Sequence, residues 1–258
     1  MNNDSPAKAV LVVLGTALVC SLLVTTAAVT LKPIQQAYKD LERNRFIVGI
    51  SGLVEPGAEL ADAEVVDVFQ DLEVRLVDID AGRFDQRMNP LTFDQRQAAS
   101  DPELGVDIPT DLDAAGLGRR SRLATVFIVG DPNSPERIIL PIRGQGMWST
   151  IYAYLALDGD LNSIAEVTFY EQGETAGIGD KILDPGWQSG WRGRTLFDAN
   201  GVLAFRVAAG AATTPNDVDA IAGATQTTNG VTAMVQYWFG PHGYKPFLEN
   251  LEAGNAGP

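Results

Sequence analysis

The chain opens with a long apolar run that gives way to patterned, mixed sequence. No charged residue occurs from Ala9 to Leu31, and as a helix this run would span about 35 Å, enough to cross the hydrocarbon core of a membrane. A cleaved signal peptide is the alternative, but its apolar stretch is usually only about 7–15 residues long. We therefore expect a short tail over residues 1–8 and one retained transmembrane helix over residues 9–31.

Helical periodicity resumes after Lys32-Pro33, where the apolar run ends. An apolar stripe at helical spacing predicts a helix leaving the membrane, formed by Ile34, Ala37, Tyr38 and Leu41. A second amphipathic helix is predicted over residues 61–72. Its apolar face would carry Val65, Val68, Phe69 and Leu72. A last helix is predicted from about Thr225 to Gly240-Pro241, with Val231, Met234, Val235 and Trp238 on one face.

Between these helices, apolar runs bounded by turn residues predict strands. The runs cover residues 74–79, 123–129, 137–142, 150–157, 164–170 and 202–208. Residues 82–121 are polar and rich in Asp, Pro and Gly, which predicts a long excursion of loops. Neighbouring strands with helices set apart predict an α+β fold around a largely antiparallel sheet flanked by helices. One domain should cover residues 32–258, with residues 54–121 as a subregion of it.

Composition narrows the chemistry that this chain can perform. A net charge of −14 argues against nucleic-acid binding, because phosphate contacts need a clustered excess of Lys and Arg. The chain has one Cys and one His, so it can form no internal disulfide. An iron–sulfur cluster or a zinc site of Cys and His would need ligands from partners. Redox chemistry in this chain would therefore use a bound organic cofactor, and we expect no metal site.

The stretch from Asp219 to Gly230 is the most informative for chemistry. It places the hydroxyls of Thr225, Thr227 and Thr228 at a helix start, where unpaired N–H groups and the helix dipole favour a phosphate. The small residues Gly223 and Ala224 leave the Thr225 hydroxyl accessible. The alternative is that these threonines only cap the helix.

Residues 219–225, Asp-Ala-Ile-Ala-Gly-Ala-Thr, resemble the motif that flavin transferases recognise when they move FMN from FAD onto Thr. That motif reads Asp-x-x-Ser/Thr-Gly-Ala-Thr, and Ala222 replaces its usual Ser or Thr. The resemblance implies that Thr225 carries FMN through a phosphoester bond and that Asp219 is a recognition residue. Thr227 and Thr228 would bind the same phosphate, or one of them would be the attachment site instead.

Three further stretches, residues 144–150, 171–179 and 187–191, occur in the order and spacing of one family. With the apolar N-terminal run and the Thr225 motif, the chain resembles the C subunits of sodium-translocating NADH:quinone reductases, a bacterial membrane complex. Ala176 and Ile178 replace the usual Pro and Leu of its flavin-site loop. The residues that the resemblance assigns to FMN binding are Trp148, Ser149, Glu174, Thr175, Gly177, Ile178, Gly223, Ala224, Thr227 and Thr228.

These assignments compete with plainer interpretations of the same residues. Glycines 173, 177 and 179 could be turn residues, although backbone lying close to a flavin edge also needs Gly. Trp148, Trp187 and Trp191 could be core residues, as tryptophans in globular domains commonly are. Glu174 could be a solvated loop acid.

The resemblance implies an electron-transfer subunit that relays electrons by its FMN within a complex that oxidises NADH, reduces ubiquinone and exports sodium. Partners would be the other subunits and, during maturation, a flavin transferase. By itself, the chain would have no activity. In this family the domain lies on the periplasmic side of the bacterial inner membrane. The positive residues Lys32, Lys39, Arg43 and Arg45, which follow the apolar run, taken alone favour the cytoplasmic side.

Two other functions remain open from the sequence. The flavin subunit of the ferredoxin:NAD reductase complex shares the Gly-Ala-Thr motif and a single anchor. The Trp-Ser-Thr segment at 148–150 and the length of residues 54–121 favour the sodium-translocating family. The third possibility is an anchored periplasmic binding module without a redox role, in which the threonines only cap a helix.

Overall fold

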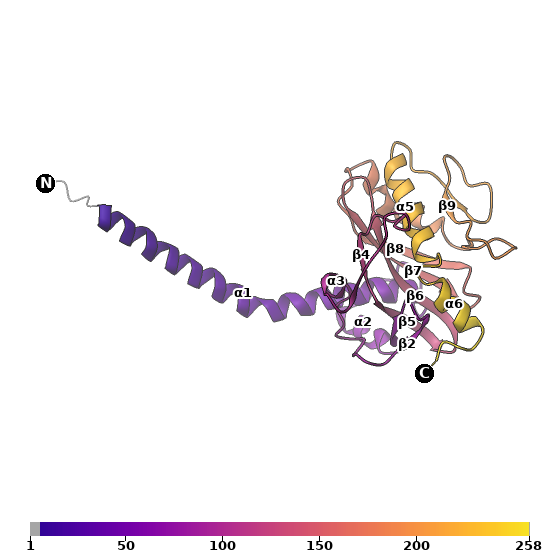
Figure 1. Cartoon of the computed structure of the whole chain (residues 1–258), viewed down its shortest axis with the longest axis horizontal. Helices are drawn as coiled ribbons and strands as arrows, with labels where there is room; N and C mark the ends of the chain where they lie inside the picture. Colours follow the sequence, from indigo (N-terminus) through magenta and orange to yellow (C-terminus); the bar gives the residue numbers. More distant parts are fainter. Residues whose placement is uncertain (1–5, 258) are drawn as a thin grey trace. The chain divides into compact units, whose positions relative to one another are not determined.

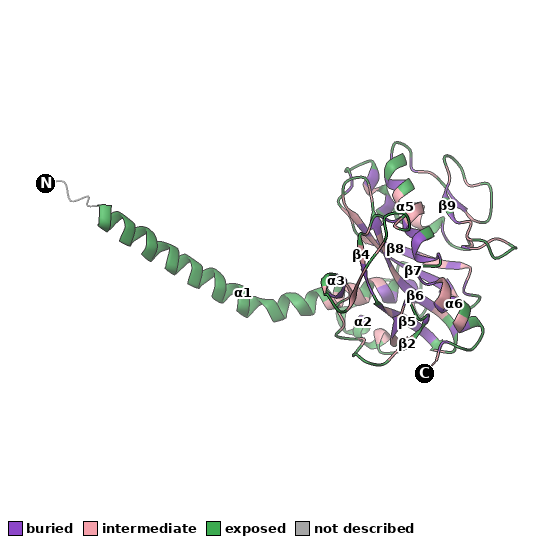
Figure 2. Ribbon diagram, viewed as in Figure 1, coloured by how far each residue is buried: buried purple, intermediate pink, exposed green. Residues whose placement is uncertain are grey.

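The structure is a computed structural model that describes residues 6–257, so residues 1–5 of the predicted tail lie outside the described residues. Helix α1 (Pro6–Ser51) is 46 residues long and is drawn in indigo and violet in Figure 1. By length and composition it could cross a membrane. Its residues from Pro6 to Lys39 are exposed, as the green ribbon in Figure 2 shows.

The helices predicted before Lys32-Pro33 and after it form one continuous helix, because α1 continues through Pro33. A proline inside a helix removes one backbone hydrogen bond and commonly ends or kinks it. Here the residues after Pro33 keep a helical apolar pattern, and the last turn buries Ile47, Val48 and Ile50. The chain divides into two compact units after Arg45, so this last turn belongs to the second unit.

The second unit is built on a six-stranded sheet with the order β2-β1-β5-β6-β7-β8. Every neighbouring pair of strands in it is antiparallel. The strands are β1 (Glu73–Asp78), β2 (Arg83–Asp85), β5 (Leu123–Asp131), β6 (Ser134–Gln145), β7 (Thr150–Asp158) and β8 (Ile164–Glu171). The predicted α+β class with a largely antiparallel sheet is confirmed, as are all five strands predicted between residues 74 and 170.

Side chains alternate across the sheet, as strand geometry requires, and each face has its own core. On β7, Ala153 and Leu155 join the larger core, which includes helices α5 (Thr225–Trp238) and α6 (Lys245–Glu252). Tyr154 and Ala156 join the smaller core on the other face, with α2 (Asp62–Phe69) and the last turns of α1. The predicted helices at residues 61–72 and from Thr225 are confirmed.

Residues 54–121 are part of this unit rather than a separate body. They supply β1 and β2 to the sheet and also contain α3 (Gln95–Ser100), β3 (Gly105–Asp107) and β4 (Arg119–Ser121), which the sequence analysis did not predict. The side chain of Arg120 is buried, pairs with Asp80 and donates to the Tyr237 hydroxyl at 3.2 Å. This contact ties β4 to α5.

The strand predicted over residues 202–208 is largely wrong. Only β9 (Arg206–Val207) forms there, and it pairs in parallel with β10 (Asp217–Val218) outside the main sheet. Phe205 is buried by loop packing instead, with its ring 4.7 Å from that of Trp191, whereas Val202 is exposed. Between β8 and β9 lie two short helices, η1 (Gly179–Leu183) and α4 (Pro185–Ser189).

Candidate functional site

The three threonines at the start of α5 differ in exposure and in bonding. Thr225 is the first helical residue and is exposed, while Ala224 takes the N-cap position and no side chain caps the helix. Thr227 is buried and donates to Oε2 of Glu174 at 2.6 Å. Thr228 is buried and donates to the carbonyl oxygens of Ala224 and Thr225 at 3.2 and 3.1 Å. Of the three hydroxyls, that of Thr225 is the accessible one.

Glu174 is buried and accepts hydrogen bonds from two separate parts of the chain. Its Oε1 accepts from the backbone N–H groups of Trp148 and Ser149 at 3.0 and 3.3 Å. Its Oε2 accepts from the N–H of Met147 at 3.1 Å and from the Thr227 hydroxyl at 2.6 Å. The side chain is 8% exposed, so Glu174 is not a solvated loop acid. Both of its oxygens bind protein donors.

These contacts determine the protonation state of Glu174. Burial raises the pKa of its carboxyl, but hydrogen bonds from the Thr227 hydroxyl and three backbone N–H groups favour the anion more strongly, so the pKa lies below its usual range. Folding therefore favours the ionised form of Glu174 over the protonated form. Its stabilising contribution is complete above the unfolded pKa and is lost as pH falls through the folded one.

Glycines bring the backbone close around Glu174. A Cβ at Gly146 would lie 2.5 Å from Oε1 of Glu174, and one at Gly179 would lie 2.8 Å from the Thr227 hydroxyl. Gly230, inside α5, packs against the Gln145 carbonyl, where a Cβ would approach to 2.5 Å. Gly179 therefore serves internal packing. No role was predicted for Gly230, although a lone Gly in a helix is a signal of close approach.

Gly177 and Gly223 have a different reason to be glycine. Their φ angles are +75° and +79°, a left-handed conformation that glycine adopts without strain. A Cβ at Gly177 would meet nothing within 4 Å, and one at Gly223 would meet only Ile178, at 3.8 Å. Both positions therefore have a backbone conformation that favours glycine and open space where a side chain would begin. Thr175, also exposed, holds this turn because its carbonyl accepts from the N–H groups of Ile178, Gly179 and Asp180.

Large apolar side chains are exposed on the turn at residues 147–149 and on the loop that contains Glu174. Met147 is 51%, Trp148 66% and Ile178 43% exposed. Trp148 is therefore not a core residue, unlike Trp191, which is fully buried. Ser149 is half-buried, and its hydroxyl accepts from the Gly173 N–H at 2.6 Å.

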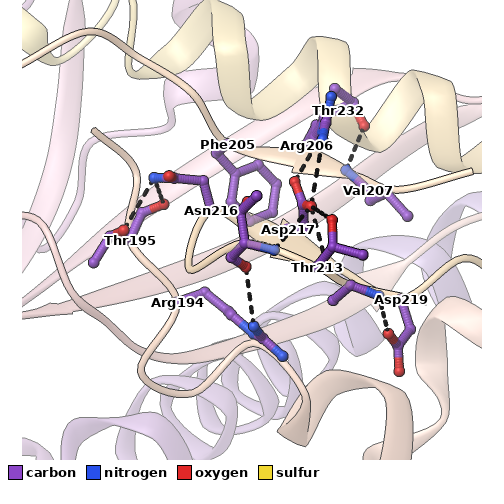
Figure 3. Close-up of polar contacts among 12 residues, drawn as sticks. Arg194, Thr195, Phe205, Arg206, Val207, Thr213, Asn216, Asp217, Asp219 and Thr232 are labelled. Carbon is purple, nitrogen blue, oxygen red and sulfur yellow. Dashed lines mark hydrogen bonds and ion pairs between the residues drawn. The ribbon is translucent and has the colours of Figure 1, made fainter. Parts of the chain in front are cut away.

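The segment before α5 is held by two aspartates, drawn in Figure 3. Asp219 is exposed; its Oδ1 accepts from the Ala212 N–H at 2.6 Å, and its carbonyl accepts from Nε1 of Trp187 at 2.8 Å. Asp217 is buried and accepts from Nε of Arg206 at 2.8 Å. The pairing with Arg206 holds the Asp217 pKa well below its usual range.

Asp217 also accepts from the N–H groups of Thr213 and Thr214 and from the Thr213 hydroxyl. These bonds close the loop that leads from β9 to β10. The role of Asp217 was not predicted, although the sequence Asp-Val-Asp that ends at Asp219 is a visible signal. The Val207 N–H donates to the Thr232 hydroxyl at 2.9 Å (Figure 3). This hydrogen bond ties β9 to α5.

This set of groups fits FMN. The start of α5 offers unpaired N–H groups and one accessible hydroxyl, which suit a phosphate. The exposed Trp148 and Ile178 offer apolar surface for a ring, and the open space at Gly177 and Gly223 leaves room beside it. Within residues 6–257, no group of three or more Cys, His, Asp or Glu side chains could hold a metal ion.

Comparison with known proteins identifies the family. The FMN-binding domain family matches residues 146–240, which contain all of these segments. The C subunit of the Na(+)-translocating NADH-quinone reductase of Pseudomonas aeruginosa is 40% identical over 99% of both chains. The corresponding protein of Vibrio alginolyticus is 37% identical over 98% of both chains. The chain belongs to this C-subunit family.

Solved structures agree with this C-subunit assignment. The crystal structure of Shewanella oneidensis NqrC superimposes with a TM-score of 0.77 at 36% identity and covers 84% of this chain and 99% of its own. The crystal structure of the C subunit from Parabacteroides distasonis, with a TM-score of 0.65 and 23% identity, shows the same fold. The predicted family and the FMN-binding domain are thereby confirmed.

Proposed function

We propose that this C subunit is the electron relay of a sodium-translocating NADH:ubiquinone reductase and that its FMN is bonded to Thr225. The observation that carries the assignment is the exposed Thr225 at the first position of a 14-residue helix. The first turn of this helix is joined through Glu174 to the turn that carries the exposed Trp148. Thr227 and Thr228 are poor attachment sites, because both are buried and their hydroxyls already bind acceptors.

Attachment would be a phosphoryl-type substitution in which Thr225 Oγ is the nucleophile. Its oxygen forms a bond to the FMN phosphorus of FAD, the bond from that phosphorus to the AMP moiety breaks, and AMP leaves. The hydroxyl proton passes to a base of the flavin transferase. Asp219, six positions before Thr225, is the recognition residue of that transferase. Its side chain lies on the surface, where an enzyme could contact it.

When bound, FMN supplies the capacity to accept and donate electrons, and the chain supplies its placement. N–H groups at the start of α5 would hold the phosphate. Trp148 and Ile178, both exposed, would hold the ring by offering it apolar surface. Gly223 and Ala224 leave the approach to Thr225 open. The chain thus binds and positions the flavin, and NADH and quinone react on other subunits.

The apolar part of α1, residues 9–31, would anchor the subunit in the bacterial inner membrane beside the other subunits of the complex. We place the domain that follows in the periplasm, as the family resemblance implies and against the count of Lys and Arg. A reporter that is active only after export, fused to Pro258, should be active. Activity of a cytoplasm-only reporter at the same position would overturn this orientation.

Two other functions are disfavoured by specific observations. Relatives at 37–40% identity over nearly the whole chain carry the name of the sodium-translocating reductase, which argues against the ferredoxin-linked complex. A binding module with capping threonines is disfavoured because no side chain caps α5.

The direct test is flavin retention after denaturation. The full chain, produced together with a flavin transferase, should give a fluorescent band on a denaturing gel. Thr225→Val should abolish the fluorescence while the protein still folds, because the side chain is exposed. Thr228→Val is the matched control and should keep the fluorescence. A fluorescent Thr225→Val band would overturn the assignment.

A further inference from the structure

Glu174 connects segments that are distant in sequence and that both take part in the proposed flavin site. One is the turn at residues 147–149, whose three successive N–H groups all point at its carboxylate, at 3.0 to 3.3 Å. The other is the first turn of α5, reached through the Thr227 hydroxyl at 2.6 Å. Glu174 itself lies in the loop that follows β8.

We propose that Glu174 is the positioning residue of the flavin site: its carboxylate fixes the turn that carries Trp148 to the helix end that carries Thr225. This inference rests on the proposed FMN attachment at Thr225. Glu174 acts through Trp148 and Thr225 rather than by touching the flavin. This role differs from the one implied by the family resemblance, which placed Glu174 among the residues that contact FMN.

The geometry explains why the ring and the attachment point need such a connection. The phosphoester to Thr225 would hold only one end of FMN, through rotatable bonds, and leaves the ring free to move. Trp148 is 66% exposed, so packing of its side chain does little to hold the turn. The three N–H bonds to Glu174 hold the backbone of that turn instead. The same carboxylate holds α5 two residues beyond Thr225.

The chemistry requires a carboxylate at this position. All four partners act as donors: three backbone N–H groups, which can do nothing else, and the Thr227 hydroxyl. A glutamine would turn an NH₂ group toward at least one backbone N–H, and two donors cannot bond each other. An alanine at Gly146 or Gly179 would collide with Glu174 itself. The backbone around Glu174 is thus shaped to admit this side chain.

The test uses the full chain with covalent FMN, in detergent, and reads the flavin itself. Glu174→Gln keeps the size of the side chain and leaves Thr225 intact, so peptide mass spectrometry should still find the FMN adduct. The visible circular dichroism of the bound flavin should be lost, and its fluorescence should rise toward that of free FMN as the ring leaves the quenching indole of Trp148. Glu171→Gln is the matched control, because Glu171 is the last residue of β8, close to Glu174 in sequence, but is exposed.

A second pair of variants keeps the test decisive if Glu174→Gln fails to fold. Thr227→Ser retains the hydroxyl donor and should keep the flavin signature, whereas Thr227→Val removes the donor and should weaken it. An adduct on Thr225 with unchanged dichroism and fluorescence in both Glu174→Gln and Thr227→Val would overturn the positioning role alone. Absence of an adduct from the unmodified chain would instead overturn the proposed function.

Discussion

Replacing Asp217 by Asn tests the account of the loop that leads into the proposed attachment motif. Asp217 is 1% exposed, and its Oδ1 accepts from Nε of Arg206. Its Oδ2 accepts from the Thr213 and Thr214 N–H groups and, at 3.4 Å, from Nη2 of Arg206. An asparagine turns its NH₂ group toward one of these sets of donors, whichever way it is rotated. The variant thus loses a charge-assisted bond or leaves backbone N–H groups without an acceptor.

The size of the stability loss follows from the burial of Asp217 and the exposure of Arg206. A hydrogen bond to a charged group contributes about 1.5–3 kcal/mol, and a buried donor left unsatisfied costs about 1–3 kcal/mol. Because the Arg206 side chain is 57% exposed and can be rehydrated, we expect a loss of about 2–3 kcal/mol in the free energy of unfolding. For a domain of this size, that loss lowers the Tm by roughly 4–12 °C.

The assay is urea unfolding of the full chain in detergent, followed by tryptophan fluorescence, with Trp191 as a buried reporter near this loop. Asp107→Asn is the matched control. Asp107 also pairs with an arginine, with its Oδ1 2.7 Å from Nε of Arg119, but the Asp107 side chain is 84% exposed. Removing an exposed pair should cost only about 0–1 kcal/mol. Equal stability losses in the two variants would refute the reasoning.

The pH dependence of the Asp217 effect has a definite sign. The folded pKa of Asp217 lies below its unfolded value, so its charge stabilises the fold fully above the unfolded pKa of about 3.9. That contribution is lost as pH falls from there through the folded pKa. The stability gap between the unmodified chain and Asp217→Asn should therefore be constant from neutrality to about pH 5 and then narrow. A gap that widens with acid would contradict the assignment.

Three further outcomes follow from the structure. Ile47→Ala should lower the free energy of unfolding of the domain by about 2–5 kcal/mol because Ile47 is fully buried, while Ile34→Ala, exposed on the same helix, should change it by less than about 0.5 kcal/mol. Gly179→Ala should lower the free energy of unfolding by about 1–3 kcal/mol, because its Cβ would lie 2.8 Å from the side chains of Glu174 and Thr227. Gly210→Ala places its Cβ in open space and should change this free energy little. The purified chain with its flavin should not oxidise NADH in a spectrophotometric assay; steady turnover would contradict its role as a relay.

The parts of the fold that the sequence predicted well are those with local signals. The strands at β5 to β8 are apolar runs separated by short polar turns such as Asp158-Gly159-Asp160, and their hairpin pairing needs no distant information. Helix α5 has a regular apolar stripe and ends at Trp238, just before the stop signal Gly240-Pro241. In the site, the small residues before Thr225 indicated an accessible hydroxyl, and the structure places Thr225 on the surface.

The parts that could not be predicted depend on contacts between distant segments. Pro33 is locally a helix terminator, yet α1 continues through it and ends in the packing of Ile47 and Ile50. Glu174 resembles a solvent-exposed loop acid in sequence, because its donors at residues 147–149 and Thr227 lie 25 to 53 positions away. The role of Asp217 likewise depends on Arg206, which was assigned to a strand that hardly forms.

The central claim is the covalent bond between FMN and Thr225, and peptide mass spectrometry tests it most directly. The full chain should be produced together with a flavin transferase, digested, and fragmented so that Thr225, Thr227 and Thr228 are resolved. We expect the mass of FMN, less one water, on Thr225 and unmodified Thr227 and Thr228. An adduct on Thr227 or Thr228, or a peptide without any adduct from yellow protein, would contradict the account.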